Sequence, residues 1–365
     1  MQYTGRDIEH LEPRVDRNII DFVNVLDREY ISKGRIFDFA RKAQYFTLDV
    51  ISDVSFGQAF GFVKSDLDMY DYIAMLEAQM PKMIMTSIYP WLVDLMGLPL
   101  FKRLLPSDKD VAGFGKLIGI AKATAATRFG PDAITQNDML GSFVAHGLTQ
   151  SDAESEILVQ IVAGSDTTAT AIRSTMIHII TSPRVSRRLH SEMTEAGILS
   201  RPWNSVIPDS EARGLKYLQS IIKEGLRIFP PAVGLVSKVV PSTGDTWRGV
   251  SLPAGTKVGY CAWGIMRNPE VWGDDADEFR PERWLETEDG ERLMEMEATL
   301  ELVFGMGRWQ CLGRNVALME LNKVFVELLR RFEFVLYHPV EPWKTKSCGL
   351  FVQSDFWIKG YNRQV

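Results

Sequence analysis

One segment of the sequence, from Ser151 to Pro183, constrains the fold more than any other. Ser151 and Glu154 match the pattern of a capping box, and Pro183 ends the helical pattern. About 30 residues at 1.5 Å each give a helix roughly 45 Å long. The radius of gyration expected for a chain of this length is about 21 Å. We therefore expect this helix to cross the molecule with its middle in the core. The predicted buried stripe consists of Ile157, Ile161, Ser165, Thr168, Ile172 and Met176.

The middle of this helix, Ala163-Gly164-Ser165-Asp166-Thr167-Thr168, is made of poor helix formers. Gly costs about 1 kcal/mol relative to Ala in a helix, and the Ser, Asp and Thr side chains compete for backbone hydrogen bonds. One interpretation is a crossing point of small residues between packed helices. The other is a groove in which Asp166 and Thr167 deliver protons. In that case Gly164 would leave room for a ligand against the backbone.

A second unusual segment runs from Phe304 to Gly313 and reads FGMGRWQCLG. Its first two glycines allow the backbone to approach something flat or bulky. Cys311 is expected at the start of a final helix, from about Leu312 to Arg331, whose N-terminus lowers the pKa of a thiol. An iron site or a nucleophilic mechanism requires such a thiolate, whereas the simpler alternative is a buried, inert cysteine. The segment has no Cys-x-x-Cys motif and no nearby His, which argues against a zinc site or a redox disulfide.

Two shorter charged motifs precede this segment. Glu224 and Arg227 lie three residues apart on a helix that ends at Phe229-Pro230-Pro231, and Arg283 belongs to the sequence PERW. On a surface such an ion pair contributes only about 0.2–0.5 kcal/mol. Taken alone, each motif indicates no more than a solvated charged segment.

Taken together and in this order, the four motifs AGSDTT, EGLR, PERW and FGMGRWQCLG resemble the cytochrome P450 superfamily of haem-thiolate monooxygenases. The sequence around Cys311 is most similar to that of filamentous-fungal, pisatin-demethylase-like members. The resemblance implies a mainly α (α+β) cytochrome P450 fold with a long central helix and small β-sheets, shortened at the N-terminus. It implies a single domain over residues 1–365, helix-rich over 1–230, with mixed β-structure and the haem-binding region over 231–365.

The resemblance also implies roles for individual residues. Cys311 would be the axial thiolate on the iron of haem b, and Asp166 and Thr167 would deliver protons. Trp309 stands where relatives usually have Arg or His, so Arg308 is the neighbour that could compensate. Substrate-facing segments would include Val233 to Val236 and Gly349 to Phe351. The implied haem-binding residues are Cys311, Phe304, Gly305, Arg308, Trp309, Gly313, Ala163, Gly164 and Lys238, and the implied buried structural network is Glu224, Arg227 and Arg283.

The function implied by the resemblance is a monooxygenase that inserts one oxygen atom of O₂ into a hydrophobic small molecule. Electrons would come from NADPH through a separate reductase, in fungal secondary metabolism or xenobiotic oxidation. An alternative is a truncated, non-catalytic remnant with weak or no haem binding, because the resemblance covers only about the C-terminal three quarters of a family member. A cysteine-nucleophile hydrolase would leave the EGLR and PERW motifs unexplained.

The composition limits the classes of partner and the cellular location that we expect for the chain. Asp and Glu outnumber Lys and Arg by 47 to 41, which argues against nucleic-acid binding, and three scattered cysteines indicate a reducing compartment. The N-terminus is polar, and charges and prolines interrupt the apolar stretch from Met80 to Phe101. We therefore expect a soluble intracellular chain, whereas full-length relatives occupy the endoplasmic reticulum membrane.

The last third of the chain contains the predicted strands. Pro and Gly separate short apolar runs after Pro230. The acidic segment from Glu286 to Glu301 is expected to be a solvated loop. The predicted strands are Leu235 to Val240, Thr246 to Val250, Thr256 to Tyr260, Phe332 to Tyr337 and Phe351 to Ile358.

Overall fold

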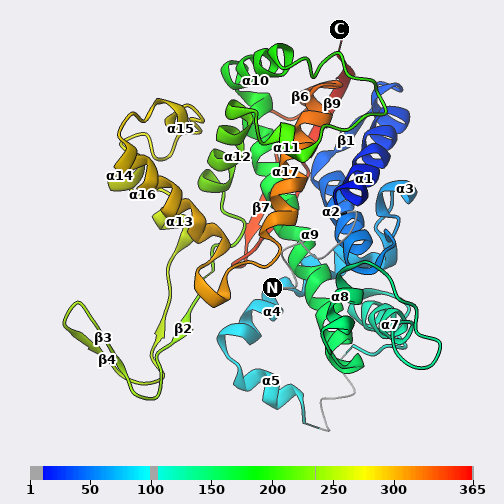
Figure 1. Cartoon of the computed structure of the whole chain (residues 1–365), viewed down its shortest axis with the longest axis vertical. Coiled ribbons are helices and arrows are strands. Elements are labelled where there is room, and N and C mark those ends of the chain that lie inside the picture. The colour runs from blue at the N-terminus through cyan, green and yellow to red at the C-terminus, as the bar shows by residue number, and fades with distance from the viewer. Residues whose placement is uncertain (1–10, 99–105, 235, 364–365) are drawn as a thin grey trace.

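The computed structural model describes residues 11–98, 106–234 and 236–363 of the chain. One long helix, α9 (Gln150–Thr181), passes through the centre, and the other helices pack around it (Figure 1). The predicted long central helix is therefore present. The polar residues at the extreme N-terminus, the end of the Met80–Phe101 stretch and Leu235 lie outside the described residues.

The two ends of α9 differ from the prediction. Thr149 is the N-cap residue: its hydroxyl accepts a hydrogen bond from the Asp152 N–H at 3.3 Å, and the Asp152 carboxylate accepts one from the Thr149 N–H at 3.4 Å. The predicted capping box at Ser151 and Glu154 is thus wrong, because Thr149 and Asp152 offer the same spacing two residues earlier. Pro183 lies just beyond the helix and occupies the first turn of the next one, where it suits the unbonded N–H position.

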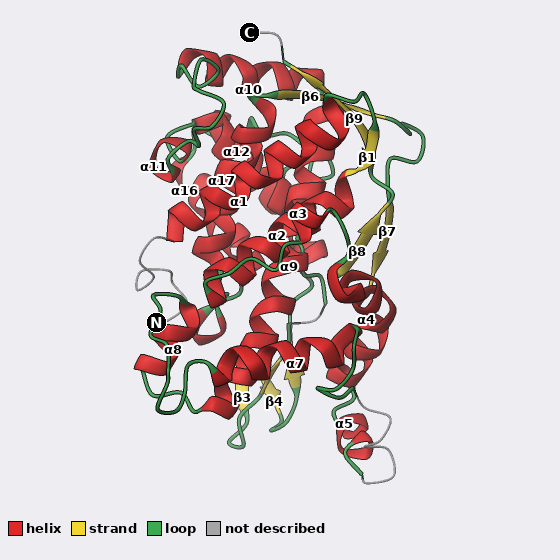
Figure 2. Cartoon of the chain, turned by 90° about the vertical axis from the view of Figure 1, so that its right-hand side faces the viewer, coloured by secondary structure: helices red, strands yellow, loops and turns green. Residues whose placement is uncertain are grey.

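The helices on one side of α9 come from the first half of the chain. Helix α2 lies along α9, and α1 packs on α2. Figure 2 shows α7 and α8 near one end of α9, with α4 and α5 close by. These helices are α1 (Leu11–Leu26), α2 (Phe39–Phe56), α3 (Phe62–Ser65), α4 (Tyr72–Ile88), α5 (Trp91–Met96), α7 (Gly113–Ala126) and α8 (Met139–Ala145).

The remaining helices follow α9 in the sequence. Helices α10, α12 and α17 contact α9 directly, and the short helices α13 to α15 lie farther out, together with α16 (Figure 1). They are α10 (Pro183–Glu195), α11 (Asp209–Ala212), α12 (Lys216–Ile228), α13 (Ala262–Ile265), α14 (Pro269–Trp272), α15 (Arg283–Glu286), α16 (Gly290–Glu301) and α17 (Arg314–Leu329).

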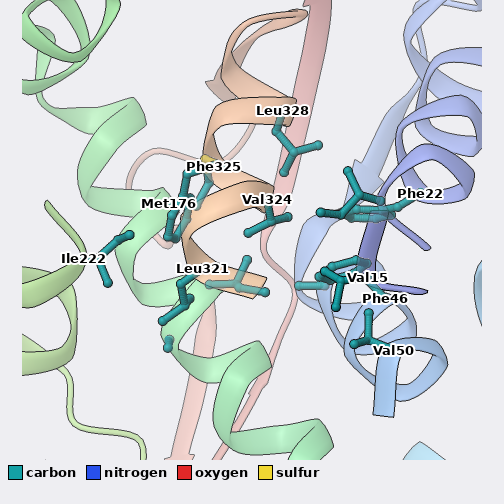
Figure 3. Close-up of a cluster of buried hydrophobic side chains, with 14 of the residues drawn as sticks. Val15, Phe22, Phe46, Val50, Met176, Ile222, Leu321, Val324, Phe325 and Leu328 are labelled. Atoms are coloured by element: carbon teal, nitrogen blue, oxygen red, sulfur yellow. The ribbon is translucent and has the colours of Figure 1, made fainter. Parts of the chain in front are cut away.

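The hydrophobic core joins α9 to helices from both halves of the chain. The rings of Phe22 and Phe46 stack with their centroids 5.2 Å apart. Figure 3 shows these rings beside Val324 and Leu328 of α17, with Met176 of α9 nearby. All six residues of the predicted α9 stripe are buried. Spacings of three and four residues thus identified the packed face of α9 correctly.

Small antiparallel sheets complete the fold. The largest has the strand order β1-β9-β6 and pairs Phe37 with Ile358 and Val335 with Lys359. It lies at one edge of the helical body, with the β7–β8 pair next to it (Figure 2). The strands of this group are β1 (Ile36–Asp38), β6 (Phe332–Leu336), β7 (Lys344–Ser347), β8 (Phe351–Ser354) and β9 (Trp357–Asn362).

Two further strand pairs follow α12. The β3–β4 hairpin projects from the body (Figure 1), and β2 pairs with β5. A hairpin turn divides the predicted strand Thr246 to Val250 between β3 and β4, because Arg248 and Gly249 have positive φ values of 47° and 81°. The predicted strand Phe351 to Ile358 is likewise divided at Asp355, where φ is 59°. The pairs are β2 (Lys238–Val239) with β5 (Lys257–Val258) and β3 (Asp245–Trp247) with β4 (Val250–Leu252).

The acidic segment is mostly helix rather than loop. The Asp289 carboxylate accepts hydrogen bonds from the N–H groups of Glu291 and Arg292 at 2.9 and 3.3 Å and so caps α16. Met296 and Leu300 lie one turn apart and are buried. The prediction of a solvated loop is wrong because this cap and this apolar pair outweigh the repulsion between acidic side chains on the exposed face.

No helix within the described ranges has the length and apolar composition that a bilayer span requires.

Candidate functional site

A tight loop before α17 carries Cys311. Gly305 and Gly307 have left-handed φ values of 75° and 60°, a backbone region that L side chains rarely adopt. The Cys311 N–H donates a hydrogen bond to the Phe304 carbonyl at 2.6 Å and closes the loop. A Cβ atom at Gly305 would lie 3.1 Å from the Trp309 carbonyl oxygen. The glycines therefore let the chain turn back on itself and present Cys311.

The thiol of Cys311 is on an exposed residue just before α17. Protein packed against the sulfur raises the pKa of the Cys311 thiol by desolvation, and the N–H groups of Gly313 and Arg314 lower it by less. The helix terminus therefore lowers this pKa as predicted, but desolvation outweighs it and the net shift is upward. A bound metal ion deprotonates a coordinating thiol outright, so a thiolate at Cys311 depends on a metal. A cysteine nucleophile would instead need a depressed pKa, which counts against the hydrolase alternative.

Two cationic side chains converge on the exposed ring of Trp309. The Lys238 ammonium nitrogen lies 5.0 Å from the ring centroid, and the Arg308 guanidinium carbon lies 4.9 Å from it. Lys238 reaches the loop from β2, some 70 positions earlier in the sequence. Trp309 itself is 59% exposed. The structure thus brings together three of the predicted haem-binding residues and places two positive charges beside the Cys311 loop.

Other residues of the Cys311 loop also have defined positions in the structure. Gly313 is the N-cap residue of α17. Phe304 lies under the Arg314 guanidinium, whose carbon is 5.4 Å from the ring centroid. Met306 and Leu312 are exposed apolar residues on the same loop. The loop therefore presents an apolar surface beside the thiol.

Glu224, Arg227 and Arg283 form one buried network. The Arg227 Nη2 and Nε atoms donate to the two Glu224 carboxylate oxygens at 2.7 and 3.0 Å, and Arg283 Nε donates to Glu224 at 3.0 Å. All three residues are at most 2% exposed. Arg227 also donates to the carbonyls of Met266 and Ala276, which ties α12 to the segment before PERW. The structure brings the three predicted residues together.

Trp284 is a member of this network that the sequence analysis did not assign. Its indole N–H donates to Glu224 at 3.0 Å, and its ring packs against Trp272 at a centroid distance of 5.5 Å. The sequence pointed to Trp284 only through its place in the PERW motif. The interpretation of that motif rested on its charged residues and left Trp284 without a role.

Asp166 and Thr167 face different surroundings although they are adjacent. The Asp166 carboxylate is buried and accepts a hydrogen bond from the Gln44 amide of α2. The Thr167 hydroxyl donates to the Ala163 carbonyl at 2.8 Å, on a more exposed side of α9. Desolvation raises the pKa of Asp166 to about 6, although Arg173 opposes the shift. Such a carboxyl group can gain and lose a proton near neutral pH.

Gly164 lies where α2 and α9 approach each other closely. A Cβ atom at this position would lie 2.7 Å from Cδ1 of Ile51 on α2. Helix packing explains this glycine, so the idea that it leaves room for a ligand is wrong on that side of the backbone. Ala163, in contrast, is exposed. That Ala163 and Gly164 border a haem stays a prediction.

The two predicted substrate-facing segments lie side by side. The N–H groups of Val233 and Gly234 both donate to the Gly349 carbonyl, at 2.8 and 3.1 Å. A β-bridge joins Ala232 to Leu350. Leu235 lies outside the described residues. Contact with a substrate stays a prediction for both segments.

Comparison with known proteins decides the family. A family model described as "Cytochrome P450" matches residues 1–355. The chain belongs to the cytochrome P450 family. It is accordingly a monooxygenase of the oxidoreductase class, a haem protein that works with a redox partner and a small-molecule substrate.

Relatives of this cytochrome P450 are fungal monooxygenases. The chain is 44% identical over 364 residues to cytochrome P450 monooxygenase ABA1 of Pyricularia oryzae, with 98% of this chain and 71% of that protein covered. It is 38% identical to cytochrome P450 monooxygenase aba1 of Botryotinia fuckeliana, with the same shares covered. It is 29% identical to cytochrome P450 monooxygenase cicH of Emericella nidulans, with 98% of this chain and 72% of that protein covered.

A solved structure supports the fold independently of sequence similarity. The haem domain of cytochrome P450DA matches all of this chain and 74% of its own, with a TM-score of 0.76 at 18% identity. The predicted fold class, mainly helical with small sheets, is confirmed.

The Cys311 loop of this cytochrome P450 fits a haem. Haem b is a flat apolar ring that bears carboxylate groups and an iron that accepts a thiolate ligand. The loop offers a thiol on an exposed residue, the exposed apolar side chains of Met306 and Leu312, and two cations at Trp309. Cys311 would hold the iron, and Lys238 and Arg308 would hold the carboxylates. Arg308 would thereby supply the charge that Trp309 lacks.

Proposed function

We propose that this cytochrome P450 inserts one oxygen atom of O₂ into a hydrophobic small molecule, with haem b held by Cys311. Haem b, when bound, supplies the redox centre at which O₂ is activated. The observation that carries the proposal is the exposed Cys311 on its glycine loop beside the Lys238 and Arg308 cations. A thiol and an apolar surface on one loop, with one cation from the loop and another from β2 beside them, match the parts of a haem.

Asp166 and Thr167 have separate roles in this proposal. Asp166 can take up and release a proton near neutral pH, because desolvation raises its pKa to about 6. Thr167 presents a hydroxyl on the less buried side of α9. The acid supplies protons from the protein interior, and the alcohol faces the reacting side.

The electron source, location and pathway complete the proposal. Electrons come from NADPH through a separate reductase, at the endoplasmic reticulum membrane. The fungal origin of the similar monooxygenases favours a role in secondary metabolism or xenobiotic oxidation. The net charge of −6 argues against a nucleic acid as a partner.

Turnover in a reconstituted system tests this proposal. The holoprotein, a fungal reductase and NADPH are incubated with a panel of hydrophobic small molecules under ¹⁸O₂, and products are analysed by mass spectrometry. We expect one ¹⁸O atom per product. We also expect Asp166→Asn and Thr167→Ala to lower the fraction of NADPH that yields product.

The chain offers a matched control for Thr167. Thr181 lies on the same helix, and its hydroxyl bonds to the Ile177 carbonyl at 2.6 Å in the same way. Thr181→Ala should leave the coupling of NADPH use to product unchanged. Products without ¹⁸O would contradict the proposal, and a holoprotein that uses no NADPH with any compound would favour the non-catalytic alternative.

A further inference from the structure

A small buried cavity lies on the α2 side of α9, between α2, α4, α9 and β8. Its polar lining consists of Gln44, Glu77, Asp166, Arg173 and Gln353, and the remaining walls are apolar residues of α4 and β8. It is about the size of a single water molecule. Nothing in the proposed function so far uses Gln353 or Glu77.

Three polar atoms at this cavity are buried without a hydrogen-bond partner among the described residues. They are Oδ2 of Asp166 and both side-chain amide atoms of Gln353. Asp166 is 7% exposed and Gln353 is 1% exposed. Leaving one such atom unsatisfied costs about 1–3 kcal/mol. Two side chains that share a cavity and both carry unpartnered polar atoms therefore indicate a bound molecule with both donor and acceptor capacity.

The surrounding hydrogen bonds fix the geometry of this site. The Gln44 amide donates to Oδ1 of Asp166, and its carbonyl oxygen accepts from Arg173 at 2.9 Å. Arg173 also donates to the Ala40 carbonyl at 2.9 Å. Gln44 and Arg173 therefore have partners already, and Oδ2 of Asp166 is the atom left for the cavity.

One ion pair at the cavity is partly exposed to solvent. Glu77 lines the cavity, and Arg41 donates to the two Glu77 carboxylate oxygens at 2.7 and 3.0 Å. The side chains of Arg41 and Glu77 are 29% and 25% exposed. This pair therefore touches solvent on one side and the cavity on the other.

We infer that this cavity holds an ordered water molecule between Asp166 and Gln353, and that the Arg41–Glu77 pair is the surface end of the path by which protons reach Asp166. The inference rests on the proposed function for its catalytic meaning, whereas the water site itself does not. A hydronium ion at Glu77 gives a proton to the bound water and becomes water, and the bound water passes one of its protons to Oδ2 of the ionised Asp166, so the bound water is unchanged. Gln353 acts as a positioning residue, since it holds the water rather than a reacting atom.

Asp166 faces several charged groups that shape its titration. Arg173 and Arg41 favour the ionised form of Asp166, and Glu77 disfavours it. The Tyr72 hydroxyl lies 3.5 Å from the hydroxyl of Ser165, the residue before Asp166 on α9. Removing the bound water would desolvate the carboxyl group further. In a Gln353→Leu variant we therefore expect Asp166 to titrate at a higher pH than in the parent protein.

A crystal structure of the holoprotein at high resolution gives the first test. We expect a water peak within hydrogen-bond distance of Asp166 Oδ2 and the Gln353 amide, and its loss in Gln353→Leu. Infrared difference spectra, parent minus Asp166→Asn, then follow the carboxyl group against pH in both backgrounds. A direct hydrogen bond between Gln353 and Asp166, or an unchanged titration in Gln353→Leu, would overturn the water site.

Coupling measurements test the path to the surface. Gln353→Leu and Glu77→Gln should each lower the ratio of product to NADPH several-fold and increase the solvent deuterium isotope effect. Gln160→Leu is the matched control, because Gln160 is another buried α9-side glutamine with two unpartnered amide atoms and it lies outside the cavity. Glu297→Gln, which removes half of an exposed pair with Lys223, is the control for Glu77.

These outcomes separate the inference from the proposed function. Unchanged coupling and isotope effects in both variants would overturn the path even if turnover is robust. Failure of all turnover would contradict the proposed function, and the water peak and the carboxyl titration would still decide the water site.

Discussion

Glu224 and Arg227 form a bidentate ion pair in which both side chains are completely inaccessible to solvent. Taking two charges out of water is costly, and here the cost is offset because Arg283, Trp284 and three backbone carbonyls supply further hydrogen bonds. The network joins α12 to the PERW segment, which precedes the Cys311 loop. Its role follows from this geometry: it holds the framework of the site and touches no substrate.

Removing Glu224 should therefore destabilise the protein strongly. Glu224→Ala leaves Arg227 buried without its counter-charge and leaves Arg283 with Asp275 as its acidic partner, at a cost of about 3–5 kcal/mol. Glu297→Ala is the control, since Glu297 pairs with Lys223 at the exposed surface and its removal should cost less than about 1 kcal/mol. Chemical denaturation of the two variants measures the difference. Equal unfolding midpoints would show that the buried network contributes no more than a surface pair.

Lys238 should strengthen haem retention. If its ammonium group, beside Trp309, binds a haem carboxylate, Lys238→Ala should release haem about tenfold faster, which corresponds to roughly 1.4 kcal/mol. Arg308→Ala should act in the same direction. Transfer of haem to an excess of apomyoglobin measures the rate. Lys257→Ala on the paired strand β5 is the control, and equal release rates for Lys238→Ala and Lys257→Ala would contradict the assignment.

Gly164 should be intolerant of a side chain because of Ile51. Gly164→Ala places a Cβ atom 2.7 Å from Ile51 Cδ1, and overpacking of this kind costs about 1–3 kcal/mol. The double variant Gly164→Ala, Ile51→Ala should recover part of that loss, because the second change removes the clashing atoms. Thermal denaturation of the single and double variants forms the cycle. Additive effects would mean that the two residues do not compete for space.

Asp166 should make the protein less stable as the pH rises from about 4 to about 6. Its pKa is about 6 in the folded protein against 3.8 in the unfolded chain, so the folded state binds more protons in this window. The total effect is roughly 3 kcal/mol at most, at 1.36 kcal/mol per pKa unit. Asp166→Asn removes this dependence, so its stability relative to the parent protein should increase across the window. Denaturation midpoints at several pH values measure the difference.

His178 complicates the absolute pH profile but not this comparison. Burial lowers the pKa of His178 to about 4, and its ring stacks on Phe279. The unfolded state therefore binds more protons at His178 between about pH 4 and 6.5, which makes stability rise with pH. Both proteins keep His178, so its contribution cancels. A difference between the parent protein and Asp166→Asn that does not change with pH would contradict the buried-acid assignment.

Much of the fold was predictable from local patterns. The α9 stripe, the final helix and most of the strands follow from apolar spacing and from Pro and Gly positions. Boundaries were less certain, because Thr149 and Ser151 both begin a capping pattern and the sequence does not say which hydroxyl meets the helix end. Helix α16 was not predicted because its many acidic residues suggested a solvated loop. The Asp289 cap and the buried pair Met296 and Leu300, which stabilise the helix, were not considered.

The parts of the site whose residues are close together in the sequence were predictable. The contacts between residues far apart in the sequence were not. Cys311 and its glycines lie within one loop, and Glu224 and Arg227 within one helical turn. Gln44 is 122 positions from Asp166, and Gln353 comes from β8, so only the tertiary structure could bring them to the same cavity. The sign of the Cys311 pKa shift was also unpredictable, because desolvation depends on packing that no motif encodes.

The carbon-monoxide difference spectrum of the reduced protein tests the central claim most directly. We predict the strongly red-shifted Soret band of thiolate ligation for the parent protein and for Cys261→Ser and Cys348→Ser, which change the other two cysteines. Cys311→Ser should lose this band. A parent spectrum typical of neutral or histidine ligation, the absence of bound haem, or a band that survives in Cys311→Ser would contradict the account.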